Sequence, residues 1–170
     1  MAKTKRPISA RRPSTADMAQ VILASASPRR KELLNRLELL FNIVPSSVEE
    51  NYNNGMAPLE MAKWWALEKA RNVAAAHPET IVVGADTIVV LEGNILGKPE
   101  DSSEAAAMLR KLSNKSHTVH TGVALVQKSN EAEISFVEST EVTFFELDET
   151  LISSYVTTGS PLDKAGAYGI

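Results

Sequence analysis

The chain has 170 residues, of which 18 are basic and 21 acidic, and a net charge of −3. It contains no cysteine, which excludes disulfides, thiolate zinc sites and thiol nucleophiles. No apolar run approaches the roughly 20 residues that a membrane-spanning helix needs, so we expect no membrane-integral segment.

The charge is unevenly distributed along the chain. Residues 1–19 carry a net charge of +4 and two prolines, which predicts a disordered basic extension, with an organelle-targeting segment as the alternative. The remaining residues carry −7 and no basic stripe, which argues against nucleic acid as a partner. Together with the lack of cysteine, this composition favours a cytoplasmic protein.

The first predicted elements are a strand and a helix. A β-branched run predicts a buried strand at about 20–24. Ser27 in an N-cap position, followed by a proline, predicts the start of a helix over 28–39. At helical spacing, the residues that this helix would bury are Leu33, Leu34 and Leu37.

The middle of the chain predicts two further strands around a long helix. A strand is expected at 41–47, and a helix that starts at a proline is expected over 58–76. Two strands, at 80–84 and 87–91, then flank a polar interruption, and a short return follows at 95–96.

The last third alternates helices with long strands. Asp101 is expected to cap a helix, and Asp148 to cap the last one. Between them, 116–129 and 132–147 alternate as antiparallel partners. The element order β-α-β-α-β-β-α-β-β-α predicts an α/β domain with a mixed sheet flanked by helices.

The stretch "LASASPRRKELL" places hydroxyl and guanidinium groups where a strand turns into a helix. The amides and dipole at a helix N-terminus favour anions, and arginine forks match phosphate oxygens. Ser25, Ser27, Arg29 and Arg30 would then form a cradle for a polyanion. The alternative is a capped surface helix with two solvated arginines.

The stretch "VVGADTIVV" interrupts an apolar region with Asp86 and Thr87. Polar groups in such a place need partners, and ligands gather at strand ends in α/β sheets. Gly84 and Ala85 leave room for a ligand to approach. The alternative is a tight turn that Asp86 caps.

Charged residues near glycines or small residues form a third group: Glu50, Lys69, Lys98 and Lys164. Each alone is typical of a solvated surface, but together with Asp86 and the arginines they fit cleavage of a nucleoside triphosphate. The acids would hold a divalent cation or activate water, and the cations would neutralise phosphate charge. No G-x-x-x-x-G-K-[ST] loop is present, which excludes a P-loop nucleotide hydrolase.

Six segments then carry a resemblance: "LASASPRRKELL", "PSSVEE", "LEKA", "GADTIVVLEGNILGKPED", "HTVHTGVAL" and "PLDKAGAYGI". In order and spacing they resemble the Maf family of nucleoside triphosphate pyrophosphatases, over about residues 20–170. The resemblance implies an elongated fold similar to inosine triphosphatases, with a central cleft, and a homodimer. It also implies hydrolysis of a surplus nucleoside triphosphate to the monophosphate and pyrophosphate, which cleans the nucleotide pool. The implied cofactor is a divalent metal, Mg²⁺ first and Mn²⁺ or Co²⁺ as alternatives.

The resemblance also implies residue roles. Asp86 matches the proton acceptor that activates water, Glu50 would hold the metal with it, and Lys98 belongs to the catalytic set. Arg29 and Thr87 match positions that go with substrate choice. The residues that would bind the triphosphate are Ser25, Arg29, Arg30, Lys69, Thr87 and Lys164.

The "GADT" segment resembles the branch of the family that acts on dTTP and UTP. A 7-methyl-GTP pyrophosphatase is one alternative, and a non-enzymatic, nucleotide-binding regulator of septum formation is another. The family pattern continues beyond the position of Ile170 with a glutamine and a glycine-rich segment, so we expect 20–170 to be a C-terminally incomplete domain.

Overall fold

The computed structural model of the chain describes residues 21–52 and 55–169. The expected disorder of residues 1–19 falls outside them and stays a prediction. The elements follow in the order β1 (Val21–Leu23), α1 (Pro28–Asn35), β2 (Phe41–Ile43), α2 (Pro58–Ala74), β3 (Ile81–Leu91), β4 (Asn94–Leu96), α3 (Ser102–Leu112), β5 (Ser116–Gln127), β6 (Ala132–Thr143) and α4 (Glu149–Thr157).

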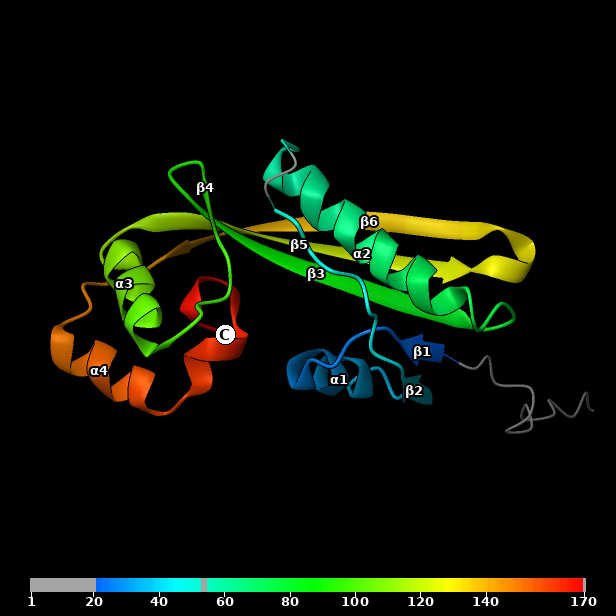
Figure 1. Cartoon of the computed structure of the whole chain (residues 1–170), viewed down its shortest axis with the longest axis horizontal. Coiled ribbons are helices and arrows are strands. Elements are labelled where there is room, and N and C mark those ends of the chain that lie inside the picture. Colours follow the sequence, from blue (N-terminus) through cyan, green and yellow to red (C-terminus); the bar gives the residue numbers. More distant parts are fainter. Residues whose placement is uncertain (1–20, 53–54, 170) are drawn as a thin grey trace, which may run out of the picture.

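The strands form one mixed sheet. Its order is β2-β1-β3-β5-β6, and β4 pairs with the far end of β3. β1 lies parallel to β2 and β3, whereas β5 lies antiparallel to β3 and β6. β3, β5 and β6 run along the long axis of an elongated molecule, α2 lies along them, and α3 and α4 gather at the opposite end from β1 and β2 (Figure 1). The predicted mixed sheet flanked by helices is confirmed.

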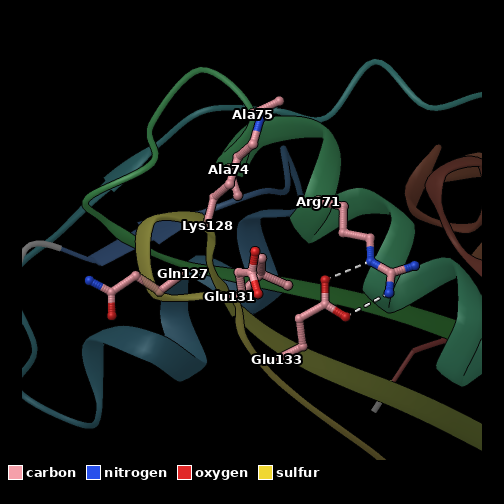
Figure 2. Close-up of a pocket in the computed structure, with 8 residues that line it drawn as sticks. Arg71, Ala74, Ala75, Gln127, Lys128, Glu131 and Glu133 are labelled. Carbon is pink, nitrogen blue, oxygen red and sulfur yellow. Dashed lines mark hydrogen bonds and ion pairs between the residues drawn. The ribbon is translucent and has the colours of Figure 1, made fainter.

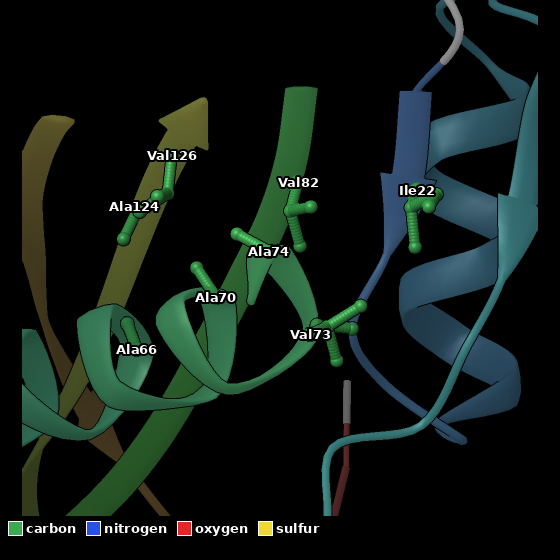
Figure 3. Close-up of a cluster of buried hydrophobic side chains, with 9 residues drawn as sticks. Ile22, Ala66, Ala70, Val73, Ala74, Val82, Ala124 and Val126 are labelled. Atoms are coloured by element: carbon green, nitrogen blue, oxygen red, sulfur yellow. The ribbon is translucent and has the colours of Figure 1, made fainter. Parts of the chain in front are cut away.

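Two glycines let α2 approach the sheet closely. A Cβ on Gly84 of β3 would lie 2.1 Å from the Ala66 carbonyl oxygen, and one on Gly122 of β5 would lie 2.1 Å from that of Ala62. Small and β-branched side chains fill the interface between α2 and the strands (Figure 3). These residues are Ile22, Ala24, Ala66, Ala70, Val73, Ala74, Val82, Ala124 and Val126. The side chain of Lys69, which α2 presents next to this interface, therefore reaches Asp86 in the middle of β3.

A buried histidine anchors the segment that follows α4. His117 of β5 is 3% exposed, and its Nε2 lies 2.6 Å from the hydroxyl oxygen of Tyr168. Burial raises the pKa of Tyr168 to about 12. The Phe144 ring packs edge-on against both rings. The backbone N–H of Gly166 donates to the carbonyl of Gly97 at 2.9 Å, which ties the same segment to the loop after β4.

The predictions based on local chemistry are confirmed. The Asp101 side chain accepts from Glu104 N at 2.8 Å, and Asp148 accepts from Leu151 N at 2.8 Å. The expected antiparallel pair is β5 and β6. Ser27 occupies the N-cap of α1, although its side chain makes no capping hydrogen bond.

The predicted interruption between 80–84 and 87–91 is wrong, because β3 is one continuous strand from Ile81 to Leu91. Asp86 therefore does not cap a turn. The polar residues interrupt only the hydrophobic pattern, since pairing with β5 continues through Gly84, Asp86 and Thr87. The return predicted at 95–96 is β4.

The predicted burial of leucines on the first helix is also wrong. α1 ends at Asn35 rather than near 39, and Leu33 and Leu37 are 59% and 63% exposed, while Leu34 is half-buried. The reason is position, because no described element packs extensively over this helix at the rim of the sheet. The strand predicted at 41–47 is the shorter β2.

Candidate active site

The candidate site lies where one edge of β3 has no neighbouring strand within the described part of the chain. β5 pairs with β3 over Val82–Val90 on one edge. On the other edge, β1 pairs over Ile81–Val83 and β4 over Val89–Leu91. Residues 84–88 lie between these two partners, and they include Asp86 and Thr87.

Asp86 and Lys69 form a buried ion pair. Asp86 is 2% and Lys69 7% exposed, and Lys69 Nζ lies 2.6 Å from Asp86 Oδ1. Lys69 reaches this point because Gly84 and Gly122 admit α2 against the strands. Burial raises the pKa of Asp86, and the charge of Lys69 only partly opposes this effect. Asp86 Oδ2 is buried and has no hydrogen-bond partner in the described part of the chain.

Glu50 contacts the same lysine from the loop before α2. Its Oε1 lies 2.5 Å from Lys69 Nζ, and the Tyr52 hydroxyl donates to its Oε2. Burial tends to raise the pKa of Glu50, but the hydrogen bonds from Lys69 and Tyr52, with the charges of Lys69 and Lys98, lower it overall. One ammonium group therefore joins two carboxylates, and Lys98 lies within electrostatic range.

Arg30 connects the first turn of α1 to β3. Its Nη1 donates to Ser25 Oγ at 3.2 Å and to the Ala85 carbonyl at 2.8 Å, and its Nη2 to Thr87 Oγ1 at 3.4 Å. Burial lowers the pKa of Arg30, against the opposing charges of Asp86 and Glu50. The Ser27 backbone N–H also donates to Ser25 Oγ at 3.2 Å. Arg30 thus links Ser25, another member of the predicted phosphate cradle, to the strand that carries Asp86.

Arg29 and Lys164 form a second cationic group. A Cβ placed on Gly169 would lie 2.0 Å from Arg29 Nη1 and 3.0 Å from Lys164 Cδ, so both side chains line that glycine. Lys164 Nζ donates to Ser160 Oγ at 3.1 Å and to Asp163 Oδ1 at 2.5 Å. The hydrogen bond from Lys164 lowers the pKa of Asp163. The two side chains reach the same glycine although they lie 135 positions apart in the sequence.

The oxygen ligands for a metal ion are limited. The described residues contain no group of three or more His, Cys, Asp or Glu side chains that could hold an ion. Glu50 and Asp86 both lie against Lys69 Nζ, which marks a place where a positive charge is stabilised, and Asp86 Oδ2 has no hydrogen-bond partner within residues 21–52 and 55–169. Two carboxylates with substrate phosphates suit Mg²⁺, which prefers oxygen ligands. The residues therefore fit a divalent ion bound together with substrate.

Two pockets lie away from Asp86. One of about 530 Å³ lies at the end of α2, beside the β5–β6 turn, where Arg71 is paired with Glu133 (Figure 2). Another of about 440 Å³ is lined mainly by apolar residues of α3, α4 and the end of β6, and it reaches Gly169. Neither is lined by a residue predicted for the site, so the expected central cleft stays a prediction.

Along the described stretches, no helix has the length and apolar character to cross a membrane.

The structure places nine of the predicted residues, all but Ser27, in two groups. The members of the first group are joined by hydrogen bonds, ion pairs or electrostatic effects: Ser25, Arg30, Glu50, Lys69, Asp86, Thr87 and Lys98. Arg29 and Lys164 make up the second. Sequence reasoning missed Tyr52, Ser160 and Asp163. Tyr52 is a single tyrosine in a polar loop, so no sequence pattern points to it.

Comparisons with known proteins identify a family and several similar proteins. The profile of the Maf-like protein family matches residues 20–170. A protein of Bacillus cytotoxicus named dTTP/UTP pyrophosphatase is 52% identical over 153 residues, which are 90% of this chain and 79% of that protein. One of Moorella thermoacetica with the same name is 51% identical over the same shares. A HAM1 protein structure from Coxiella burnetii has a TM-score of 0.49 at 20% identity, covering 73% of this chain and 72% of that one. The chain belongs to the Maf-like protein family.

Proposed function

We propose that the chain is a nucleoside triphosphate pyrophosphatase that hydrolyses dTTP and UTP to the monophosphate and pyrophosphate. The observation that carries the proposal is the buried Asp86 carboxylate, which has one oxygen paired to Lys69 and the other without a hydrogen-bond partner among the described residues. A raised pKa suits a general base, because proton transfer is most efficient when the pKa of the base approaches the working pH. The substrate class comes from relatives about half identical over 90% of the chain.

In this proposal Asp86 accepts a proton from a water molecule while the oxygen of that water attacks the α-phosphorus. The bond between the α-phosphorus and the oxygen that bridges to the β-phosphorus breaks, and pyrophosphate leaves with that bond's electron pair. Ser25 Oγ already accepts two hydrogen bonds, so its own O–H is the group that would donate to a phosphate oxygen. Arg29, Lys98 and Lys164 would neutralise phosphate charge from the two sides of the site.

We further propose that Glu50 and Asp86 hold a divalent cation, with Mg²⁺ the first candidate. Such an ion supplies charge neutralisation at the phosphates when it is bound. Lys69 would keep the two carboxylates ionised and close together. A homodimer, a cytoplasmic location and a role in cleaning nucleotide pools or in septum formation remain predictions from the family resemblance.

The test is pyrophosphate release by the purified chain with Mg²⁺, Mn²⁺ or Co²⁺ over dTTP, UTP, CTP, ATP, GTP and 7-methyl-GTP. We expect dTTP and UTP to be the fastest substrates, and Asp86→Asn to lower kcat at least about 10²-fold, the size of a general-base contribution. Faster turnover of 7-methyl-GTP would favour the other branch of the family. Tight dTTP binding by calorimetry without pyrophosphate release would favour a non-enzymatic nucleotide-binding protein.

A further inference from the structure

Arg30 occupies the position that a strand would otherwise take beside β3. The last main-chain hydrogen bond between β1 and β3 runs from Ala24 N to the Val83 carbonyl at 2.8 Å. The chain then turns into α1, and the next carbonyl on that edge, two residues along, is that of Ala85. Arg30 Nη1 donates to it at 2.8 Å, so a side chain continues the ladder where the backbone leaves it.

This contact bears directly on Asp86. The carbonyl of Ala85 and the N–H of Asp86 belong to one planar peptide group and point in opposite directions. The carbonyl is held by Arg30, while β5 pairs with Asp86 on the opposite edge through Gly122. Fixing the peptide plane from both edges fixes the direction of the Asp86 side chain toward Lys69.

Arg30 also holds the next polar side chain. Its Nη2 donates to Thr87 Oγ1 at 3.4 Å, and that hydroxyl lies 3.4 Å from Thr121 Oγ1 on β5. Through Nη1 the same guanidinium bonds Ser25. One planar fork thus spans the start of α1 and both neighbours of Asp86, a geometry that a lysine ammonium cannot reproduce.

We propose that Arg30 is a positioning residue for Asp86 and Thr87 rather than a ligand of the substrate phosphates. The inference rests on the proposed function for its kinetic test, but the contacts themselves are independent of it. The proposal gives the two arginines of "SPRR" different roles. Arg29 lies beside Lys164 and Gly169, where it can bind a polyanion, whereas Arg30 supports β3.

The kinetic test compares Arg30→Lys with Arg29→Lys. Arg36→Lys is a matched control on the exposed part of the same segment, where the Arg36 side chain pairs with Glu32 at 3.3 Å. We expect Arg30→Lys to lower kcat about 10²-fold, the effect of a small misplacement of a reacting group, with little change in KM. Arg29→Lys should raise KM, and Arg36→Lys should leave both unchanged. A raised KM with an unchanged kcat in Arg30→Lys overturns the proposal.

A second measurement uses the unaltered protein, so it stands even where Arg30→Lys does not fold. Arginine side-chain NMR should show a guanidinium signal of Arg30 that exchanges slowly with solvent and stays in place when α,β-imido-dUTP is added, while that of Arg29 moves. A fast-exchanging Arg30 signal, or one that moves as much as that of Arg29, overturns the proposal. Absence of pyrophosphate release by the wild-type chain counts against the proposed function alone, because slow exchange of Arg30 still tests the contact.

Discussion

Two cations of α2 stand two residues apart and each joins a pair of carboxylates, but in opposite environments. The Lys69 side chain lies between Glu50 and Asp86 and is 9% exposed. The Arg71 side chain lies between Glu68 and Glu133 and is 45% exposed. Residues two apart on a helix point about 200° apart, so one faces the sheet and the other faces water.

The difference in burial changes what each cluster does. Around Lys69, burial raises the pKa of Asp86 in spite of the ion pair. In the cluster around Arg71, the hydrogen bond that Arg71 donates to Glu133 lowers the pKa of Glu133. The exposed group is screened by water and ions, and contributes little beyond local order. The buried cluster around Lys69 holds charges in a place where a single unpaired charge would be unfavourable. Such clusters, with shifted pKa values, are typical of functional sites.

The largest expected effect comes from removing the buried cation. Lys69→Met leaves Glu50 and Asp86 close together without a counter-ion, and loss of one partner of a buried pair costs about 3–5 kcal/mol. We expect urea denaturation to show a decrease of this size in the free energy of unfolding. We also expect pyrophosphate release to be lost. Arg71→Met is the matched control on the same helix and should cost less than about 1 kcal/mol. Equal costs for the two variants would contradict the comparison.

Local chemistry made much of the fold predictable. The caps at Asp101 and Asp148 act within one helical turn, so sequence spacing identified them. The continuity of β3 was missed because it depends on partners far along the chain: β5 pairs through Asp86, and α2 docks on Gly84. The exposure of Leu37 was missed because periodicity predicts an apolar face without showing whether anything covers it.

The sequence could name candidate site residues but not their contacts. Residue types and the family resemblance pointed to the arginines and to Asp86, and the structure brings Arg30 near Asp86 but places Arg29 beside Lys164. That Arg30 bonds the Ala85 carbonyl could not be predicted, because it depends on where β1 ends relative to β3. Tyr52 was missed since a single tyrosine in a polar loop carries no pattern.

The second prediction concerns the close approach that brings Lys69 to β3. In Gly122→Ala the new Cβ would meet the backbone carbonyl of Ala62 at 2.1 Å, which α2 can relieve only by moving away. Overpacking of this kind costs about 1–3 kcal/mol, and the shift should weaken the contact between Lys69 and Asp86. Gly97→Ala is the control for stability, because among the described residues, apart from its chain neighbours, no atom lies within 4 Å of its Cβ position. Urea denaturation checks both variants, and a neutral Gly122→Ala would show that α2 is not constrained there.

The third prediction tests a buried polar contact away from both ion clusters. Tyr168→Phe removes the partner of His117 Nε2, and His117 Nδ1 is already buried and unpartnered in the described part of the chain. An unsatisfied buried polar group costs about 1–3 kcal/mol, so we expect a loss of that size in thermal or urea unfolding. Tyr155→Phe on α4 is the control, since its hydroxyl makes no hydrogen bond within the described residues. Equal losses for the two tyrosines would show that His117 does not depend on this bond.

The smallest expected effect is at the exposed cluster (Figure 2). Arg71 donates to Glu133 through Nε at 2.8 Å and Nη2 at 2.6 Å, and this lowers the pKa of Glu133. A lowered pKa in the folded state means that the stabilisation is present above the ordinary glutamate value of about 4.3 and is lost as the pH falls through the folded value. Glu133→Gln should therefore cost about 0.2–1 kcal/mol at pH 7, and less at pH 3 or in about 1 M salt. Glu138→Gln on the same strand, which makes no ion pair among the described residues, should cost nothing at either pH. A cost for Glu133→Gln that persists unchanged at pH 3 would mean that packing of the side chain, rather than its charge, stabilises this end of the sheet.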